Sequence, residues 1–108
     1  MREKYRDFWD KGKYLCSKCG LPLFSSLSKF NSGTPWPSFR KAFKEAVNVR
    51  KRVYSDIKKN EAICGKCGQH LGHLFEDGKI TGDTHPKAEL RYSILSKSIK
   101  FAKNNKAP

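Results

Sequence analysis

The chain has 108 residues, 37% of them hydrophobic, and its 23 Lys and Arg against 10 Asp and Glu give a formal net charge of +13. We expect one domain over residues 1–108 that is a monomer, with a core so modest that a metal site or disulfides would help to stabilise it. The sequence lacks a signal-peptide apolar region and any run of about 20 apolar residues, which argues against a membrane segment and favours a soluble, cytoplasmic protein.

A short helical segment is predicted at the N-terminus, over residues 1–11. Tyr5, Phe8 and Trp9 lie at positions i, i+3 and i+4, and Gly12 follows where such a helix would end. This apolar stripe is typical of a helix that packs on a core.

From residue 13 the pattern changes to strands and tight turns. Strands are expected in KYLC (13–16), PLFSSLSKF (22–30) and NVRKRVY (48–54), where Val49 and Val53 share an apolar register. These segments predict a mainly β chain.

A second helix is predicted over residues 38–47, because four apolar residues fall on one of its faces: Phe39, Ala42, Phe43 and Ala46. Before it, Pro35 and Pro37 flank Trp36 in SGTPWPSF and remove two backbone donors. This segment is therefore expected to be a rigid loop that presents the indole.

The C-terminal part combines turns and strands. EDGKITGDTHPK (76–87) is expected to be a turn-rich connection, and LRYSILSKSIKF (90–101) to form one or two strands. Residues 102–108 are expected to be a disordered tail.

Two CxxC pairs, each followed by glycine, form the strongest motif in the chain. CSKCG holds Cys16 and Cys19, and CGKCG holds Cys64 and Cys67. This spacing lets both sulfurs of a pair face one point, and four thiolates around tetrahedral Zn²⁺ leave no position for water. Because cytosolic thiols stay reduced, we predict a structural zinc site. Two disulfides or a redox-active CxxC are the alternatives.

The basic charge raises the question of nucleic-acid binding. A simple zinc ribbon separates its CxxC pairs by about 15–20 residues, whereas residues 20–63 intervene here. A basic zinc-binding module for nucleic acid or acidic partners is kept as the alternative function. It is not favoured, because the lysines are scattered and no aromatic platform is interleaved with them.

A second group of polar residues follows the second CxxC pair, in GQHLGHLFEDG. His70 and His73 are free for acid and base chemistry near neutral pH if the cysteines fill the metal's coordination sphere. Asp77 could orient one imidazole. Either histidine could instead be a packed or solvated side chain.

Ser93 lies in a stretch that would suit a stronger nucleophile. Arg91 is expected on the same strand face, because side chains alternate with a period of two. A guanidinium there would stabilise a thiolate and lower a thiol pKa from about 8.5, but would do little for a hydroxyl.

Four segments in this order closely resemble the B-type methionine sulfoxide reductases, the MsrB or SelR family: YLCSKCGLPLFSS, KFNSGTPWPSF, CGKCGQHLGHLFEDG and RYSILSKSIKF. The resemblance runs from about Tyr14 to Phe101. It implies a β-rich fold of two antiparallel sheets, with the four-cysteine zinc site remote from the chemistry. It also implies an oxidoreductase that reduces methionine-R-sulfoxide, free or within proteins.

The resemblance implies a role for each residue of the second group. Trp36 would form the apolar wall that receives the S-methyl group of the substrate, and Phe75 would shape the pocket. The other members would bind and protonate the sulfoxide oxygen (His70, His73, Asp77) or activate the nucleophile (Arg91).

The catalytic cysteine or selenocysteine of the family falls on Ser93, and here the chain departs from the pattern. A serine oxygen cannot form a sulfenic acid, so we interpret the chain as an inactive form in which serine replaces that residue. A natural binding-only homologue is the alternative. Leu95 stands where Asn is common and favours a selenocysteine parent. With all four cysteines assigned to zinc, recycling would need an external thiol such as thioredoxin.

Overall fold

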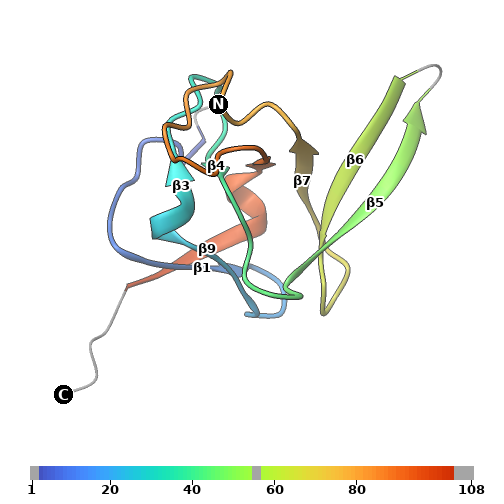
Figure 1. The fold of residues 1–108 in the computed structure, drawn as a ribbon. Coiled ribbons are helices and arrows are strands. Elements are labelled where there is room, and N and C mark those ends of the chain that lie inside the picture. Colours follow the sequence, from blue (N-terminus) through green and yellow to red (C-terminus); the bar gives the residue numbers. More distant parts are fainter. Residues whose placement is uncertain (1–2, 55–56, 104–108) are drawn as a thin grey trace.

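The computed structural model describes residues 3–54 and 57–103, and its regular elements are strands and two 3-10 turns (Figure 1). In chain order the elements are β1 (Gly12–Cys16), β2 (Pro22–Ser25), the 3-10 turn η1 (Ser26–Ser28), β3 (Lys29–Phe30), β4 (Ser38–Phe39), β5 (Val47–Tyr54), β6 (Ile57–Cys64), β7 (His70–Phe75), β8 (Arg91–Ile94), the 3-10 turn η2 (Ser96–Ser98) and β9 (Ile99–Lys103).

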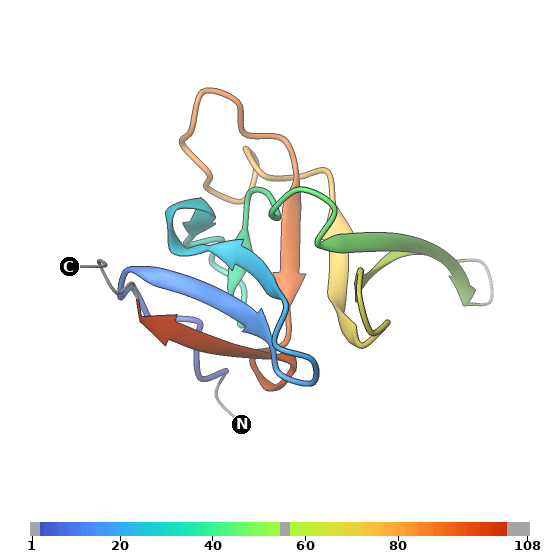
Figure 2. The same ribbon diagram turned by 90° about the horizontal axis from the view of Figure 1, so that it is seen from below.

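These strands form two antiparallel sheets, as predicted. The smaller sheet has the order β2-β1-β9, and the larger has the order β3-β4-β8-β7-β6-β5. The hairpin of β5 and β6 extends away from the rest of the molecule, which is plain in both views (Figure 1, Figure 2). None of the helical elements that the structure describes has the length and apolar character needed to cross a membrane.

Aromatic rings from both sheets form the core. Tyr14 and Phe24 of the smaller sheet are fully buried against Phe39 of β4. The rings of Phe24 and Phe39 stack at 4.4 Å, and Tyr14 meets Phe39 edge-on at 5.1 Å. Leu71 and Ile94 complete the contact from β7 and β8. Each such side chain stabilises the fold by about 1.5–3 kcal/mol, so this cluster fixes the sheets that carry the site.

The prediction of an N-terminal helix over residues 1–11 was wrong within the described part, residues 3–11. Residues 4–7 make a single turn and no α-helix follows. The backbone N–H of Tyr5 donates to Ser96 Oγ at 3.0 Å, and the Glu3 carboxylate accepts from the Ser96 N–H at 2.6 Å. Tertiary contacts with η2 therefore replace helical bonds in a segment too short for a stable isolated helix. The apolar residues still pack, since Tyr5 is buried.

The predicted helix over residues 38–47 is also absent. The first two residues form β4, and the N–H groups of Arg40 and Phe43 donate to carbonyl oxygens of Ser28 and Leu23. Glu45 has a φ of 60°, which an α-helix does not permit. The apolar periodicity arises because this segment runs along the core, not because it is helical.

The predictions for the C-terminal segment were confirmed in part. The two-strand interpretation of residues 90–101 is confirmed by β8 and β9, but residues 102 and 103 belong to β9 and not to a tail. The remaining tail residues, 104–108, lie outside the described residues. Val49 and Val53 are 44% and 66% exposed, so their shared register does not mark a buried face.

Lys29 attaches the N-terminal segment to β3. Its Nζ donates to the Arg6 carbonyl oxygen at 2.8 Å and lies 3.6 Å from the centroid of the Trp9 ring. Burial lowers the pKa of Lys29 from 10.5 to about 8, against a smaller opposing effect of Asp7.

The contribution of Lys29 to stability should therefore become more favourable as the pH rises above neutrality. The folded chain releases the Lys29 proton near pH 8, whereas the unfolded chain keeps it until about pH 10.5. Raising the pH through this window favours the folded state by up to about 3 kcal/mol relative to Lys29→Met, which does not titrate. Denaturant titrations of both proteins at about pH 7 and about pH 10 measure this difference. A difference that stays constant would contradict the assignment.

Candidate functional site

The register of the larger sheet places several polar side chains in one row. Glu61 of β6 is opposite His73 of β7, His73 is opposite Ser93 of β8, and Ser93 is opposite Ser38 of β4. Directly paired residues of antiparallel strands lie on the same face with Cβ atoms about 4.5–5.5 Å apart. The sheet itself therefore brings His73 beside Ser93, although 20 positions separate them in sequence.

A pocket of about 300 Å³ opens on this face. It contains six of the residues singled out in the sequence, Trp36, His70, His73, Phe75, Arg91 and Ser93, and its other lining residues are Thr34, Lys59, Gly72 and Leu95. The structure therefore brings together residues from four separate segments. Asp77 is not among the lining residues.

Ser93 lies at the wall of this pocket and is 9% exposed. β7 approaches it closely at Gly72, where a Cβ atom would collide with the Ser93 carbonyl oxygen. Glycine at this position therefore lets the two strands pair while both contribute to the pocket. The close pairing fixes the position of any side-chain atom at residue 93.

Asp77 contacts Arg91 and not an imidazole. Arg91 donates from Nε to Asp77 Oδ1 at 2.8 Å and from Nη2 to Oδ2 at 3.0 Å, and its guanidinium lies 4.4 Å from the centre of the Phe75 ring. The hydrogen bonds from Arg91 lower the pKa of Asp77 despite its partial burial. Asp77 thus fixes the orientation of Arg91 in place of the imidazole contact expected from the sequence.

Glu61 is a site residue that the sequence analysis missed. Its carboxylate is buried, and its Oε2 is 2.5 Å from Nδ1 of His70. Burial raises the pKa of Glu61, but hydrogen bonds from Arg52, His70 and Arg50 outweigh this and lower it to about 2. The only signal in the sequence was an acidic residue at the end of a basic stretch. Its partners depend on strand register.

His73 differs from His70 in its surroundings. Burial lowers the pKa of His73, and the nearby His70 and Lys59 lower it further against the effect of Glu61. The two rings meet edge-on, with centroids 5.5 Å apart. The pocket therefore pairs His73, whose pKa is lowered, with His70, which contacts a carboxylate.

The Trp36 loop is held by a chain of hydroxyl groups. Ser32 Oγ is 2.7 Å from Oγ1 of Thr34 and 2.7 Å from Oγ of Ser38, and the Ser38 hydroxyl also donates to the Trp36 carbonyl oxygen. Arg6 Nε donates to the Thr34 carbonyl oxygen at 2.7 Å. The indole, 41% exposed, is thus presented by a fixed loop, as predicted.

The four cysteines form a second site. All four Sγ atoms lie within 4.8 Å of one another, and the pairs Cys16–Cys67 and Cys19–Cys64 are 3.6 Å apart. A tetrahedral zinc ion with Zn–S bonds of about 2.3 Å places its sulfurs about 3.8 Å apart, so the cluster fits such an ion. No disulfide joins these cysteines, and none of them lines the pocket.

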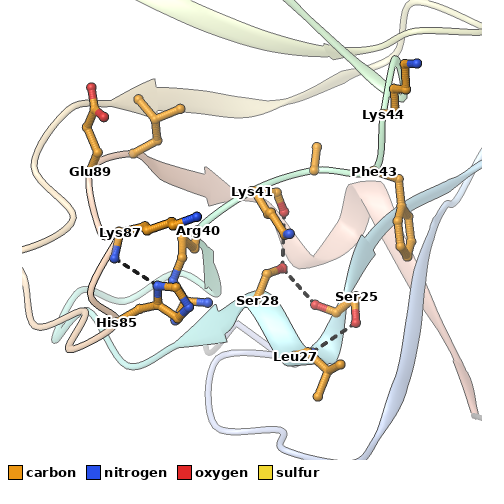
Figure 3. Close-up of a pocket in the computed structure, with 12 residues that line it drawn as sticks. Ser25, Leu27, Ser28, Arg40, Lys41, Phe43, Lys44, His85, Lys87 and Glu89 are labelled. Carbon is orange, nitrogen blue, oxygen red and sulfur yellow. Dashed lines mark hydrogen bonds between the residues drawn. The ribbon is translucent and has the colours of Figure 1, made fainter.

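A larger cavity of about 900 Å³ lies on another part of the surface, lined by Ser25, Leu27, Ser28, Arg40, Lys41, Ala42, Phe43, Lys44, His85, Lys87, Glu89 and Leu90 (Figure 3). Two of its polar side chains have partners: Arg40 binds Asp83 at 2.8 Å, and the Ser28 hydroxyl donates to carbonyl oxygens of Ser25 and Lys41. No buried side-chain nitrogen or oxygen in the described residues lacks a partner. We assign no function to this cavity.

Comparison with known proteins identifies the family. Residues 1–103 match the SelR domain. The chain belongs to the SelR family. It is 44% identical over 99 residues to the peptide methionine sulfoxide reductase MsrB of Thiobacillus denitrificans, covering 88% of this chain and 70% of that protein. The corresponding protein of Leptospira interrogans is 46% identical over 96 residues, covering 87% and 68%. Both SelR relatives are named as methionine sulfoxide reductases, which are oxidoreductases.

A solved structure shares the fold of this SelR chain. The crystal structure of the Mis18 "Yippee-like" domain matches with a TM-score of 0.67 over 90% of the chain and 100% of that domain. The two sequences are 14% identical, so this similarity concerns the fold alone.

Proposed function

We propose that this SelR protein is built to reduce methionine-R-sulfoxide, free or within proteins, and that the form with Ser93 binds this substrate without reducing it. The observation that carries the proposal is the pocket in which residue 93 lies with the indole, both imidazoles and the guanidinium. Its walls combine an apolar surface for a methyl group with donors for a sulfoxide oxygen.

The residues singled out in the sequence each receive a role in this reaction. Trp36 and Phe75 contact the apolar part of the substrate, and the imidazoles of His70 and His73 bind and protonate the sulfoxide oxygen. Arg91 stabilises the anion of a thiol or selenol at position 93. Asp77 acts through Arg91, because its carboxylate accepts hydrogen bonds from two of the three guanidinium nitrogens, Nε and Nη2.

The chemical steps require sulfur or selenium at position 93. A thiolate attacks the sulfoxide sulfur, the oxygen takes up one proton and passes to the nucleophile as the S–O bond of the sulfoxide breaks, and methionine leaves with a sulfenic acid formed on the protein. A thiol then displaces water from that sulfenic acid to give a disulfide, and a second thiol releases the reduced enzyme. Ser93 supports none of these steps, so we infer that it replaces cysteine or selenocysteine. The codon of the parent gene at this position decides between these two and a natural serine.

The reductant must come from outside the chain. All four cysteines lie in the metal-ligand cluster, which leaves none to resolve a sulfenic acid. We propose an external thiol, such as thioredoxin. We also propose that the metal is a structural Zn²⁺ held by Cys16, Cys19, Cys64 and Cys67. It would hold the two CxxC turns together and take no part in the chemistry.

We also propose a single monomeric domain over residues 1–108 and a cytoplasmic location. The alternative function, a basic module for nucleic acid or acidic partners, is supported by the +13 charge and by Ser93 at the nucleophile position. It gives no account of the pocket around residue 93.

The proposal predicts binding without turnover, with preference for one epimer. The protein with Ser93 should bind a peptide containing methionine-R-sulfoxide and leave it unreduced. Trp36→Ala should weaken this binding by about tenfold, or about 1.4 kcal/mol, because it removes an apolar wall. Calorimetric titration with the R and S peptides measures both effects.

Trp9→Ala is the matched control, because Trp9 is a similarly exposed indole that does not line the pocket. It should leave the affinity unchanged. Equal affinity for the two epimers, or equal losses in the two tryptophan variants, would count against the assignment of the pocket.

A further inference from the structure

Glu61 occupies an unusual place for an acidic residue, the middle of a sheet next to the pocket. It is 5% exposed and lies in β6 between Arg50 of β5 and His73 of β7. Its side chain reaches His70, which follows a register irregularity in the pairing of β6 and β7. The carboxylate therefore connects the projecting hairpin with the pocket.

The two carboxylate oxygens of Glu61 have different partners. Oε1 accepts from Nε of Arg50 at 3.1 Å and from Nε of Arg52 at 2.9 Å, whereas Oε2 lies 2.5 Å from Nδ1 of His70. An ionised carboxylate only accepts hydrogen bonds, so Nδ1 of His70 must carry a proton. The neutral imidazole is then the Nδ1–H tautomer, and only Nε2 exchanges a proton with a ligand.

We propose that Glu61, anchored by Arg50 and Arg52, is a positioning residue that fixes the tautomer and ring orientation of His70, so that its Nε2 is the atom that delivers a proton to a ligand in the pocket. The functional part of this inference rests on the proposed sulfoxide reduction. There the imidazolium form of His70, protonated on both ring nitrogens, passes its Nε2 proton to the sulfoxide oxygen as the S–O bond breaks, and His70 is left as the neutral Nδ1–H form. The tautomer itself is a property of the protein without substrate.

Glu61→Gln tests the arrangement with almost no change in shape. The single amide oxygen of glutamine should stay with the two arginines, because guanidinium groups only donate. The amide NH₂ would then face Nδ1 of His70 and donate to it. The proton of the neutral imidazole should therefore move to Nε2 in this variant.

The tautomer is read by nitrogen-15 NMR of the imidazoles, in the zinc-loaded protein with Ser93, at a pH where the rings are neutral. The chain has three histidines, which makes assignment direct. We expect Nδ1–H at His70 in the unchanged protein and Nε2–H in Glu61→Gln. Asp83→Asn is the control, because Asp83 is another buried carboxylate paired with an arginine but does not line this pocket. It should leave His70 unchanged.

The same substitution in the Ser93→Cys protein tests the function. Glu61→Gln should lower kcat by about a hundredfold, as loss of general acid catalysis does, while the Kd for the sulfoxide peptide with Ser93 stays within about twofold. An Nε2–H tautomer in the unchanged protein would overturn the inference without any variant. A reversed tautomer with unchanged kcat would overturn the positioning role. Inactive Ser93→Cys protein with the expected tautomers would instead contradict the proposed function.

Discussion

Replacing Ser93 by cysteine should give the protein a reductase activity that the form with serine lacks. The thiol would lie in the same pocket wall, beside the guanidinium of Arg91 and opposite His73 on the paired strand. A thiolate is a far better nucleophile toward sulfur than a hydroxyl, and it can carry the oxygen as a sulfenic acid. The gain should be from no detectable turnover to measurable consumption of methionine-R-sulfoxide, with dithiothreitol as reductant.

A double variant separates the nucleophile from its activation. Ser93→Cys with Arg91→Ala should be slower than Ser93→Cys at neutral pH and should approach it as the pH rises, because more of the unassisted thiol ionises. Zinc content and circular dichroism must match the parent protein in each case. Equal rates at neutral pH would refute the role given to Arg91, and an inert, folded Ser93→Cys protein would refute the reductase proposal itself.

Removing the metal should unfold the protein. The zinc ion joins the two CxxC turns through four thiolates, and structural zinc sites of this kind contribute about 10–16 kcal/mol to folding. This is comparable with the entire stability expected of a small domain, about 5–15 kcal/mol. A strong chelator should therefore abolish the β-sheet circular dichroism signal, and added Zn²⁺ should restore it.

Elemental analysis supplies the stoichiometry, expected to be one zinc per chain. Cys16→Ser should lower both the zinc content and the stability. Ser17→Ala changes the neighbouring residue, whose side chain accepts from Gln69 but is not part of the cysteine cluster, and should bind zinc normally. Folded protein that contains no metal would contradict the structural role.

The sequence predicted only part of the strand arrangement, because β6 and β7, which carry Glu61, His70 and His73, were not predicted as strands. β1, β5, β8 and β9 follow from alternation and turn signals. The family resemblance implied a common pocket for Trp36, His70, His73, Phe75, Arg91 and Ser93, and these six residues line one pocket in the structure. Both predicted helices failed because periodicity reports only which side chains are buried. The N–H groups of Tyr5 and Phe43 are taken up by distant partners, Ser96 and Leu23, which no local pattern contains.

Two side-chain contacts of the site also escaped the sequence analysis. Asp77 was assigned to an imidazole and contacts Arg91, and Glu61 was missed. Asp77 is four residues from His73, yet it binds Arg91 because β7 and β8 pair with Phe75 opposite Arg91. Glu61 binds His70 because an irregularity in the pairing of β6 and β7 shifts the register. Side-chain partners across a sheet depend on register, and a single sequence fixes register only weakly.

A single-turnover experiment tests the central claim most directly. Ser93→Cys protein is mixed with a racemic methionine sulfoxide peptide in the absence of any reductant, and the products are separated by epimer and analysed by mass spectrometry. The account predicts that each chain forms one methionine from the R epimer only, and that the protein gains the mass of one oxygen atom on the sulfur introduced at position 93, trapped as a sulfenic acid. Consumption of both epimers, or methionine formed without oxygen on the protein, would contradict it.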